Sequence, residues 1–445
     1  MCVESVLIRI CRSFLEILVW WLLLGAIPAM ATPHIQHWSL DNGSRVYFVE
    51  AHELPMVDIQ VVFSAGSAYD GDHPGIASLT NGLLDEGAGD WDANALADAL
   101  ARLGARLGTE SLRDMAAASL RALSESTTLE RSADLLAAVI TRPTFPPDAC
   151  ERVRAQTLVA ITNGDQSPGS VASRAFYKAL YGEYPYGHPA LGTATSVAGI
   201  TREAMIDFHH RYYVGHNAVV ILVGDLDRSG AAALAVRVAG GLSAGEAPAA
   251  LPPVPGMGAN VGVETISFPS AQTHVLSGQP GTWRGDPEYF PLYVGNHILG
   301  GGGLVSRISA EVREKRGLAY SAYSELLPMR AAGPFVMGLQ TRNHKAEEAR
   351  KVLQQTLEKF VQEGPTPEEL IKAKENITGG FALLIDSNSK VAAYLTMIAF
   401  YDLPLDYLDH FKEKVEAVTV AQIREVFQRR IDPAHLATVV VGGKE

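Results

Sequence analysis

One pattern of apolar and polar positions occurs twice in the chain. Thr201 precedes a stretch with helical spacing and a run of β-branched residues at 217–224, and Thr419 precedes a second such stretch and a second run at 435–442. The copies are offset by 218 residues at the threonines (419 − 201 = 218) and again at the final glycines (442 − 224 = 218). Each copy has the pattern of a helix capped by threonine, a short loop and a strand. The constant offset predicts a duplicated domain of about 200 residues.

The two predicted domains are separated by a segment of different composition. Residues 244–258 are rich in proline, alanine and glycine and show no apolar period, which is typical of an interdomain linker. This places the first domain at 36–243 and the second at 259–445. A chain of 445 residues is too long for one ordinary core, so its length also favours two domains.

Within the first domain, strand patterns come first and helical patterns follow. The predicted strands, joined by a short turn, are residues 45–49 and 57–64, and the predicted helices are 75–86, 93–103, 145–161 and 170–181. Strands followed by runs of helices predict an α+β fold, in which an antiparallel-rich sheet has helices packed on one face.

The first 31 residues differ from the rest of the chain. Arg9 and Arg12 precede an apolar run at 17–27, and small residues at positions 29 and 31 mark a cleavage point after Ala31. This is the pattern of a secretory signal peptide, and for a Gram-negative source it predicts a periplasmic protein. A membrane anchor is the alternative, but about eleven apolar residues are too few to span a bilayer.

Composition and charge restrict the possible partners. The chain is 47% hydrophobic and 19% charged, as expected of a folded protein, and its net charge of −12 offers no basic surface for nucleic acid. Cleavage after Ala31 would leave Cys150 as the only cysteine, so no internal disulfide can form and stability must come from the core.

Residues 75–84 (GIASLTNGLL) resemble a helix of the M16 (pitrilysin/insulinase-type) zinc peptidases. That helix usually reads G-L-A-H-F-L-E-H-M-L, and its inverted H-x-x-E-H places two zinc-binding histidines on one face with a glutamate as general base. Ser78, Asn81 and Gly82 stand at these three positions. Serine is a poor zinc ligand, asparagine cannot accept the proton, and glycine has no side chain.

The family's third zinc ligand is a glutamate in a later long helix. At the family's usual spacing, Val159 or Ala160 occupies its place, and no glutamate occurs between Glu151 and Glu183. The resemblance therefore implies a chain without the catalytic zinc and without a cofactor of its own.

Other histidines do not form a convincing replacement site. His209 and His210 are adjacent, so on a helix their side chains diverge. His34 and His37 have helix-like spacing but fall near the predicted N-terminus of the mature chain. We expect these residues to be ordinary core or surface histidines.

Residues 306–321 closely resemble the signature of the family's C-terminal domain, with Arg313 and Tyr320 seven positions apart. The resemblance implies that this pair donates hydrogen bonds across the cavity to substrate carbonyls near the scissile bond. A guanidinium and a phenol are suited to holding a peptide and stabilising an oxyanion. The alternative is an ordinary amphipathic helix over 304–315.

Four consecutive glycines, Gly300, Gly301, Gly302 and Gly303, come just before this signature. A phosphate-binding loop is excluded, because the G-x-x-x-x-G-K-[ST] pattern is missing. The resemblance implies a mobile loop beside the peptide cavity, where glycine lets a substrate backbone approach closely. A tight turn before a helix explains the run equally well.

The resemblance runs from about residue 36 to the C-terminus and implies two homologous domains forming half of a clamshell. A degenerate zinc half with an intact Arg–Tyr half is similar to the non-catalytic subunit of heterodimeric M16 peptidases. It implies a zinc-bearing partner subunit and a peptide substrate. A non-enzymatic peptide-binding or scaffold protein is the main alternative, and a peptidase with a rearranged metal site is a weaker one.

Overall fold

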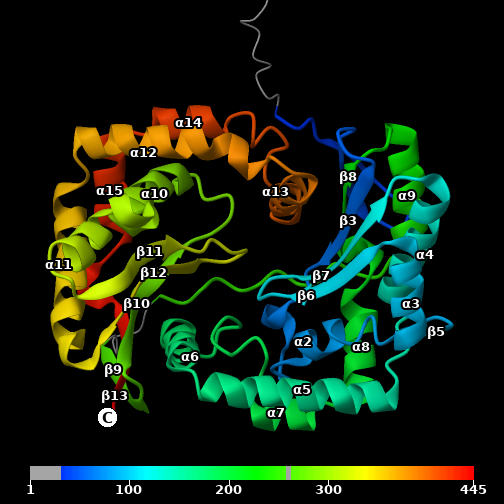
Figure 1. Cartoon of the computed structure of the whole chain (residues 1–445), viewed down its shortest axis with the longest axis horizontal. Coiled ribbons are helices and arrows are strands. Elements are labelled where there is room, and N and C mark those ends of the chain that lie inside the picture. The colour runs from blue at the N-terminus through cyan, green and yellow to red at the C-terminus, as the bar shows by residue number, and fades with distance from the viewer. Residues whose placement is uncertain (1–31, 257–261, 445) are drawn as a thin grey trace, which may run out of the picture. The chain divides into compact units, whose positions relative to one another are not determined.

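The computed structural model describes residues 32–256 and 262–444 (Figure 1). The predicted signal peptide, residues 1–31, and residues 257–258 of the predicted linker lie outside the described residues. Residues 35–445 group into one compact unit. Residues 244–256 contain no helix or strand.

The first half contains a six-stranded sheet in the order β1-β2-β8-β3-β7-β6. Its strands are β1 (Gln36–Ser39), β2 (Arg45–Glu50), β3 (Met56–Phe63), β6 (Arg106–Ser111), β7 (Ala116–Leu123) and β8 (Ala218–Gly224). Neighbouring strands are antiparallel except β2 and β8. The predicted strands β2 and β3 are therefore confirmed, but the short turn between them does not make a hairpin, because β8 lies between them.

The second half repeats this arrangement in five strands, in the order β11-β12-β10-β13-β9. They are β9 (Val263–Pro269), β10 (Gln272–Thr282), β11 (Ala319–Leu326), β12 (Gly333–Arg342) and β13 (Ala437–Lys444). Strand β13 is parallel to β9 and antiparallel to β10, as β8 is to β2 and β3. Gly224 and Gly442 also have nearly the same backbone φ, 148° and 147°. The duplication read from the sequence is a duplication of topology.

The helices of the first half agree with those predicted from the apolar spacing where capping residues mark the helix ends. They are α2 (Ile76–Asn81), α3 (Ala93–Leu103), α4 (Ser126–Thr141), α5 (Pro147–Asp165), α6 (Pro168–Tyr181), α7 (Ala194–Gly199), α8 (Arg202–Tyr212) and α9 (Arg228–Ala239). The Asp92 side chain caps α3 by accepting from the Ala95 amide, and Gly104 ends the helix in the left-handed region. The expected helix over 75–86 is shorter, because it ends at Asn81 with Gly82 as its C-cap.

The helices of the second half are α10 (Tyr289–Asn296), α11 (Ala346–Glu363), α12 (Pro367–Gly380), α13 (Asn388–Phe400), α14 (Phe411–Ala417) and α15 (Val420–Arg430). Thr201 and Thr419 cap α8 and α15 as predicted, each side chain accepting a backbone amide three residues on. The regular helix considered for 304–315 is not found. Instead a 3-10 turn, η4 (Gly303–Val305), is followed by a π-helical segment, η5 (Ser309–Glu314).

Each sheet is covered on one face by helices of its own half, as the predicted α+β fold requires, and on the other by a helix from the opposite half. Helix α13 packs on β3 and β8, and α6 packs on β10 and β13 (Figure 1). This exchange explains why β8 is buried along its whole length and reads as a continuous apolar run. No membrane-spanning helix is found among the residues that the structure describes.

Candidate functional site

Helix α2 carries the positions of the degenerate zinc motif, and its side chains serve the core. Asn81 is buried and its Nδ2 donates hydrogen bonds to the Ala117 carbonyl and the Tyr213 hydroxyl, both at 3.2 Å. Ser78 is only partly exposed, and the Gly82 amide donates to the Ser78 carbonyl. Asn81 thus ties α2 to β7 and to the end of α8, and its neutral amide cannot take the proton that a general base accepts.

A buried carboxylate holds the start of the same helix. Asp70 accepts hydrogen bonds from the backbone amides of Gly75 (2.7 Å) and Ala77 (3.0 Å). Burial raises the pKa of Asp70 to about 7, against the lowering effect of these two bonds. His188 Nδ1 lies 3.7 Å from Asp70 Oδ2, and burial lowers the pKa of His188. Both groups therefore belong to the support of α2.

The residues around α2 do not fit a zinc ion. A Cβ placed on Gly82 would lie 3.8 Å from Val153 Cγ1 of α5, while Val159 is 59% exposed and Ala160 is also exposed. An aliphatic side chain and exposed positions thus stand where a carboxylate ligand would be needed. Across residues 32–256 and 262–444, no group of three or more His, Cys, Asp and Glu side chains could hold a metal ion.

The histidines considered as a replacement site have other surroundings. His209 is buried, stacks on Tyr213 with ring centroids 4.8 Å apart, and contacts the Ile140 carbonyl through Nε2 at 3.0 Å. Burial lowers the pKa of His209 to about 4, so it is neutral. His210 is exposed, as are His34 and His37.

Arg313 and Tyr320 are brought together by two local irregularities. Arg313 lies in the π-helical segment η5, and Tyr320 lies at a bulge in β11, where the pairing with β12 shifts between Ala319 and Ser321. The Arg313 guanidinium carbon is 4.7 Å from the centre of the Tyr320 ring. A bulge re-aims its extra residue, and π-helical turns are frequent at functional sites. Both side chains therefore present one composite polar surface.

This surface is open to solvent and largely unpaired. Tyr320 is 83% exposed, Arg313 is partly exposed, and Arg313 forms an ion pair with its neighbour Glu314 at 3.3 Å. Strand β11 is also the edge strand of its sheet. A cation–π contact leaves the phenol hydroxyl and most guanidinium N–H groups able to donate outward.

Comparison with known proteins finds a family match in each half of the chain. Residues 45–194 match the family described as Insulinase (Peptidase family M16), and residues 199–377 match Peptidase M16 inactive domain. An uncharacterized zinc protease of Mycobacterium tuberculosis is 32% identical over 317 residues, covering 70% of this chain and 72% of that protein. The chain belongs to the M16 peptidase family.

Two further M16 relatives have names that describe them as inactive or non-peptidase. The crystal structure of a peptidase M16 inactive domain from Pseudomonas fluorescens is 40% identical, with a TM-score of 0.89, and covers 92% of this chain and 98% of that chain. A Helicobacter pylori protein called non-peptidase homolog YmxG is 22% identical over 95% of this chain and 98% of that protein. The family thus includes proteins named as peptidases and proteins named as inactive.

The glycine run of this M16 chain lies in helical segments as well as in a turn. Gly300 and Gly301 belong to the π-helical segment η3 (His297–Gly301), Gly302 connects it to η4, and Gly303 is the first residue of η4. Gly300 is buried against β11, where an added Cβ would lie 2.3 Å from the Ser324 amide nitrogen. A packing requirement therefore accounts for Gly300, and substrate binding by Gly300, Gly301, Gly302 and Gly303 stays a prediction.

A buried joint between the halves was not predicted from the sequence. Asp114 accepts hydrogen bonds from the hydroxyls of Tyr186 (2.5 Å) and Tyr401 (2.9 Å) and from the Arg330 amide (2.8 Å). Arg113 beside it donates to the carbonyls of Tyr186 and of His188. The Tyr-Pro-Tyr-Gly-His-Pro run at 184–189 was the available signal, but its distant partners are not visible in sequence.

Proposed function

We propose that this chain is the non-catalytic, substrate-binding subunit of a heterodimeric periplasmic M16 metallopeptidase. The observation that carries the proposal is a contrast between the two halves. Every zinc-motif position at α2 is unsuited to its original task, whereas Arg313, which is partly exposed, and Tyr320, which is exposed, remain together beside the edge strand β11. If the chain had lost every role in peptide cleavage, there would be no functional reason for Arg313 and Tyr320 to remain together.

Within such a heterodimer, the work of this chain is to bind and orient a peptide. Arg313 and Tyr320 donate hydrogen bonds to peptide carbonyls, and they stabilise negative charge that develops on the oxygen at the scissile bond. The glycines at 301–303 lie beside the passage of the peptide. A partner M16 subunit supplies the zinc ion and the hydrolytic chemistry, because the residues around α2 in this chain cannot hold the metal.

The relatives support a subunit without peptidase activity of its own. Residues 199–377 match a domain described as inactive, and the Helicobacter pylori relative is called a non-peptidase homolog. Other relatives are named zinc proteases, which agrees with a zinc-bearing partner drawn from the same family.

A peptide-binding or scaffold protein of the same fold is the second candidate. It is favoured by Asn81, whose amide completes the core as an ordinary structural residue would. Under this alternative, the Arg313–Tyr320 pair would bind peptide without a reaction to serve.

The decisive experiment is a gentle purification of the tagged protein from its native host, with zinc and co-purifying chains counted together. The proposal expects an M16 partner at near-equal stoichiometry and about one zinc ion per pair. A zinc-free homo-oligomer overturns the heterodimer and supports the scaffold. Chelator-sensitive peptidase activity of the chain alone, absent from mock purifications, would contradict the inactive zinc site.

A further inference from the structure

Arg284 is a partly buried cation without an anionic partner. In the described part of the chain no carboxylate forms an ion pair with it; its Nη1 contacts Met397 Sδ at 3.0 Å, and Tyr289 offers a hydroxyl. Its Nε is buried and has no hydrogen-bond partner. The Tyr401 ring also lies 5.6 Å from the guanidinium carbon, but a thioether, a phenol and an aromatic ring carry no negative charge, so none of these contacts neutralises Arg284. A buried charge left in this state requires an explanation.

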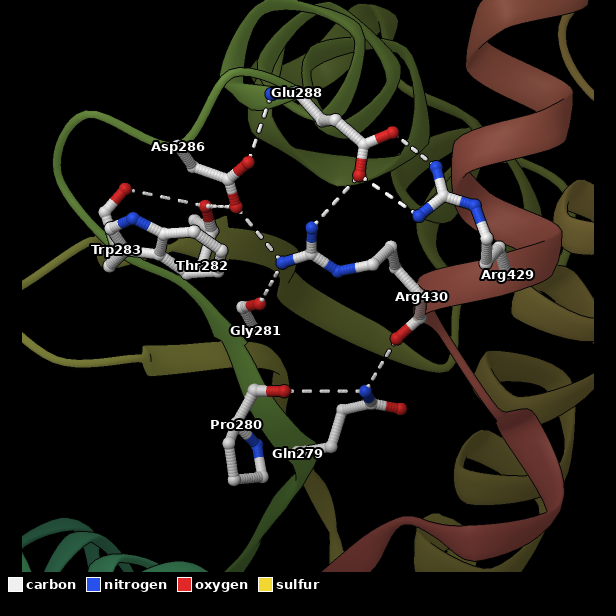
Figure 2. Close-up of polar contacts among 9 residues, drawn as sticks. All are labelled: Gln279, Pro280, Gly281, Thr282, Trp283, Asp286, Glu288, Arg429 and Arg430. Carbon is white, nitrogen blue, oxygen red and sulfur yellow. Dashed lines mark hydrogen bonds and ion pairs between the residues drawn. The ribbon is translucent and has the colours of Figure 1, made fainter. Parts of the chain in front are cut away.

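The loop that carries Arg284 is firmly held, as Figure 2 shows for the residues on either side of it. Asp286 is almost fully buried and accepts from Arg430 Nη2 (2.9 Å) and Thr282 Oγ1 (2.8 Å). The other arm of Arg430 binds Glu288 at 3.0 Å. The Arg284 amide donates to the Met329 carbonyl at 2.8 Å. The position of Arg284 is thus fixed by its neighbours, although its own side chain is not neutralised.

The neighbouring Arg430, unlike Arg284, is paired with carboxylates. It lies on the same network with two carboxylates, Asp286 and Glu288, and with the Gly281 carbonyl (Figure 2). Arg284 is two positions from Asp286 in sequence, yet the carboxylates of this network are occupied by Arg429 and Arg430. Pairing within the loop therefore leaves no anion for Arg284.

Arg284 lines a cavity of about 680 Å³ between the first sheet and α13. Strands β3, β6 and β7 form one wall and α13 forms the other. The volume lies within the range of about 300–1,000 Å³ that is typical of ligand sites, and such sites combine apolar walls with a few polar groups. The same arginine also lines a second cavity of about 390 Å³ beside Tyr289 and Tyr407.

The charges of the larger cavity favour an anion. Asp58 and Arg121 neutralise one another through a bidentate pair, with distances of 2.8 and 2.9 Å. Arg106 and Arg284 then face a single further carboxylate, Glu110. The cavity is therefore cationic by one charge (2 − 1 = +1), in a chain whose net charge is −12.

We propose that Arg284 is a specificity-determining residue that binds a carboxylate of the peptide in this cavity. The carboxylate comes from an aspartate or glutamate side chain or from the peptide's C-terminus, since both offer the same two oxygens to the guanidinium fork. The inference rests on the proposed peptide-binding function and adds a substrate class to it: acidic or C-terminal peptide segments.

The test uses a position-scanning library of unfolded peptides, made with a free carboxyl and with an amide at the C-terminus. The native complex, or the full chain if it purifies alone, retains peptides that are then quantified by mass spectrometry. The compared forms are the unaltered protein, Arg284→Gln, Arg284→Lys, and the control Arg131→Gln, an exposed arginine on α4. Melting curves establish that each variant is folded.

We expect Arg284→Gln to weaken retention of carboxylate-bearing peptides about 10- to 100-fold and to leave neutral peptides unchanged. Arg284→Lys should keep part of the preference, because it retains the charge without the fork. Loss of preference for Asp and Glu within the chain identifies a side-chain carboxylate, and loss of the acid-over-amide preference identifies the C-terminus. The control should behave as the unaltered protein does.

Two results overturn the inference and are distinguishable. Retained peptides with no carboxylate preference, or with one that survives in Arg284→Gln, overturn the role of Arg284 and leave peptide binding intact. A protein that retains no peptide of any composition overturns the peptide-binding function as well.

Discussion

Replacement of Asp114 by alanine tests the joint between the two halves. The Asp114 carboxylate is buried and accepts three hydrogen bonds. One comes from the Tyr186 hydroxyl in the first half, and two come from the second half, from the Arg330 amide and the Tyr401 hydroxyl. Burial raises the pKa of Tyr186 and of Tyr401 above the usual range, so both hydroxyls keep their protons and donate at neutral pH. The alanine variant leaves all three donors without this acceptor.

The magnitude follows from the number of bonds and their setting. Three hydrogen bonds to a charged group, at about 1.5–3 kcal/mol each, set an upper range of about 4.5–9 kcal/mol. The buried carboxylate also loses hydration on folding, and removing one member of a buried charged cluster costs about 3–5 kcal/mol. We therefore expect Asp114→Ala to lower the free energy of unfolding by about 3–5 kcal/mol.

The assay is urea unfolding followed by circular dichroism and by fluorescence, because coincident transitions are needed before a free energy can be extracted. Tyr401→Phe removes one of the three bonds and should cost about 1.5–3 kcal/mol. In the Asp114→Ala background, the same change should cost almost nothing, since its partner is gone. A loss below about 1 kcal/mol in Asp114→Ala, or fully additive effects in the double variant, would refute this account of the joint.

Three further predictions concern the proposed site and its supports. In the complex, Tyr320→Phe should lower turnover about 10- to 1,000-fold because it removes an oxyanion donor, and unchanged steady-state kinetics would remove that role from Tyr320. Asp70 has a pKa raised to about 7, so its ionisation destabilises the folded state. The stability of the unaltered protein relative to Asp70→Asn should therefore fall as the pH rises from about 4 to 7 and stay level above, as measured by urea unfolding; a difference that does not change with pH contradicts this. Gly300→Ala should lower the melting temperature, because its Cβ would lie 2.3 Å from the Ser324 amide nitrogen, whereas the control Gly379→Ala meets nothing within 4 Å and should be neutral or stabilising. Equal melting temperatures for the two glycine variants would show that Gly300 is not required for packing.

Local signals were sufficient to predict individual helices and strands in each half. The helix and strand after Thr201 and after Thr419 were predicted because capping residues and runs of β-branched residues act within a few positions. The degenerate zinc motif was a prediction from the resemblance of residues 75–84 to the M16 helix, and it needed only the residue types at Ser78, Asn81 and Gly82. The π-helical turns η3 and η5 were not predicted, because they depend on how these segments pack against β11.

The sequence by itself determined the duplicated domain, the α+β class and a zinc motif without ligands, because each depends on side-chain chemistry or on periodicity along the chain. Only the tertiary structure decided that β8 separates β2 from β3, that Asn81 ties α2 to the core, and that a bulge turns Tyr320 toward Arg313. It also decided that Asp114 has three partners while Arg284 has no carboxylate among the described residues. These features join positions that are far apart in the chain, and their pairing depends on which surfaces meet when the two halves pack.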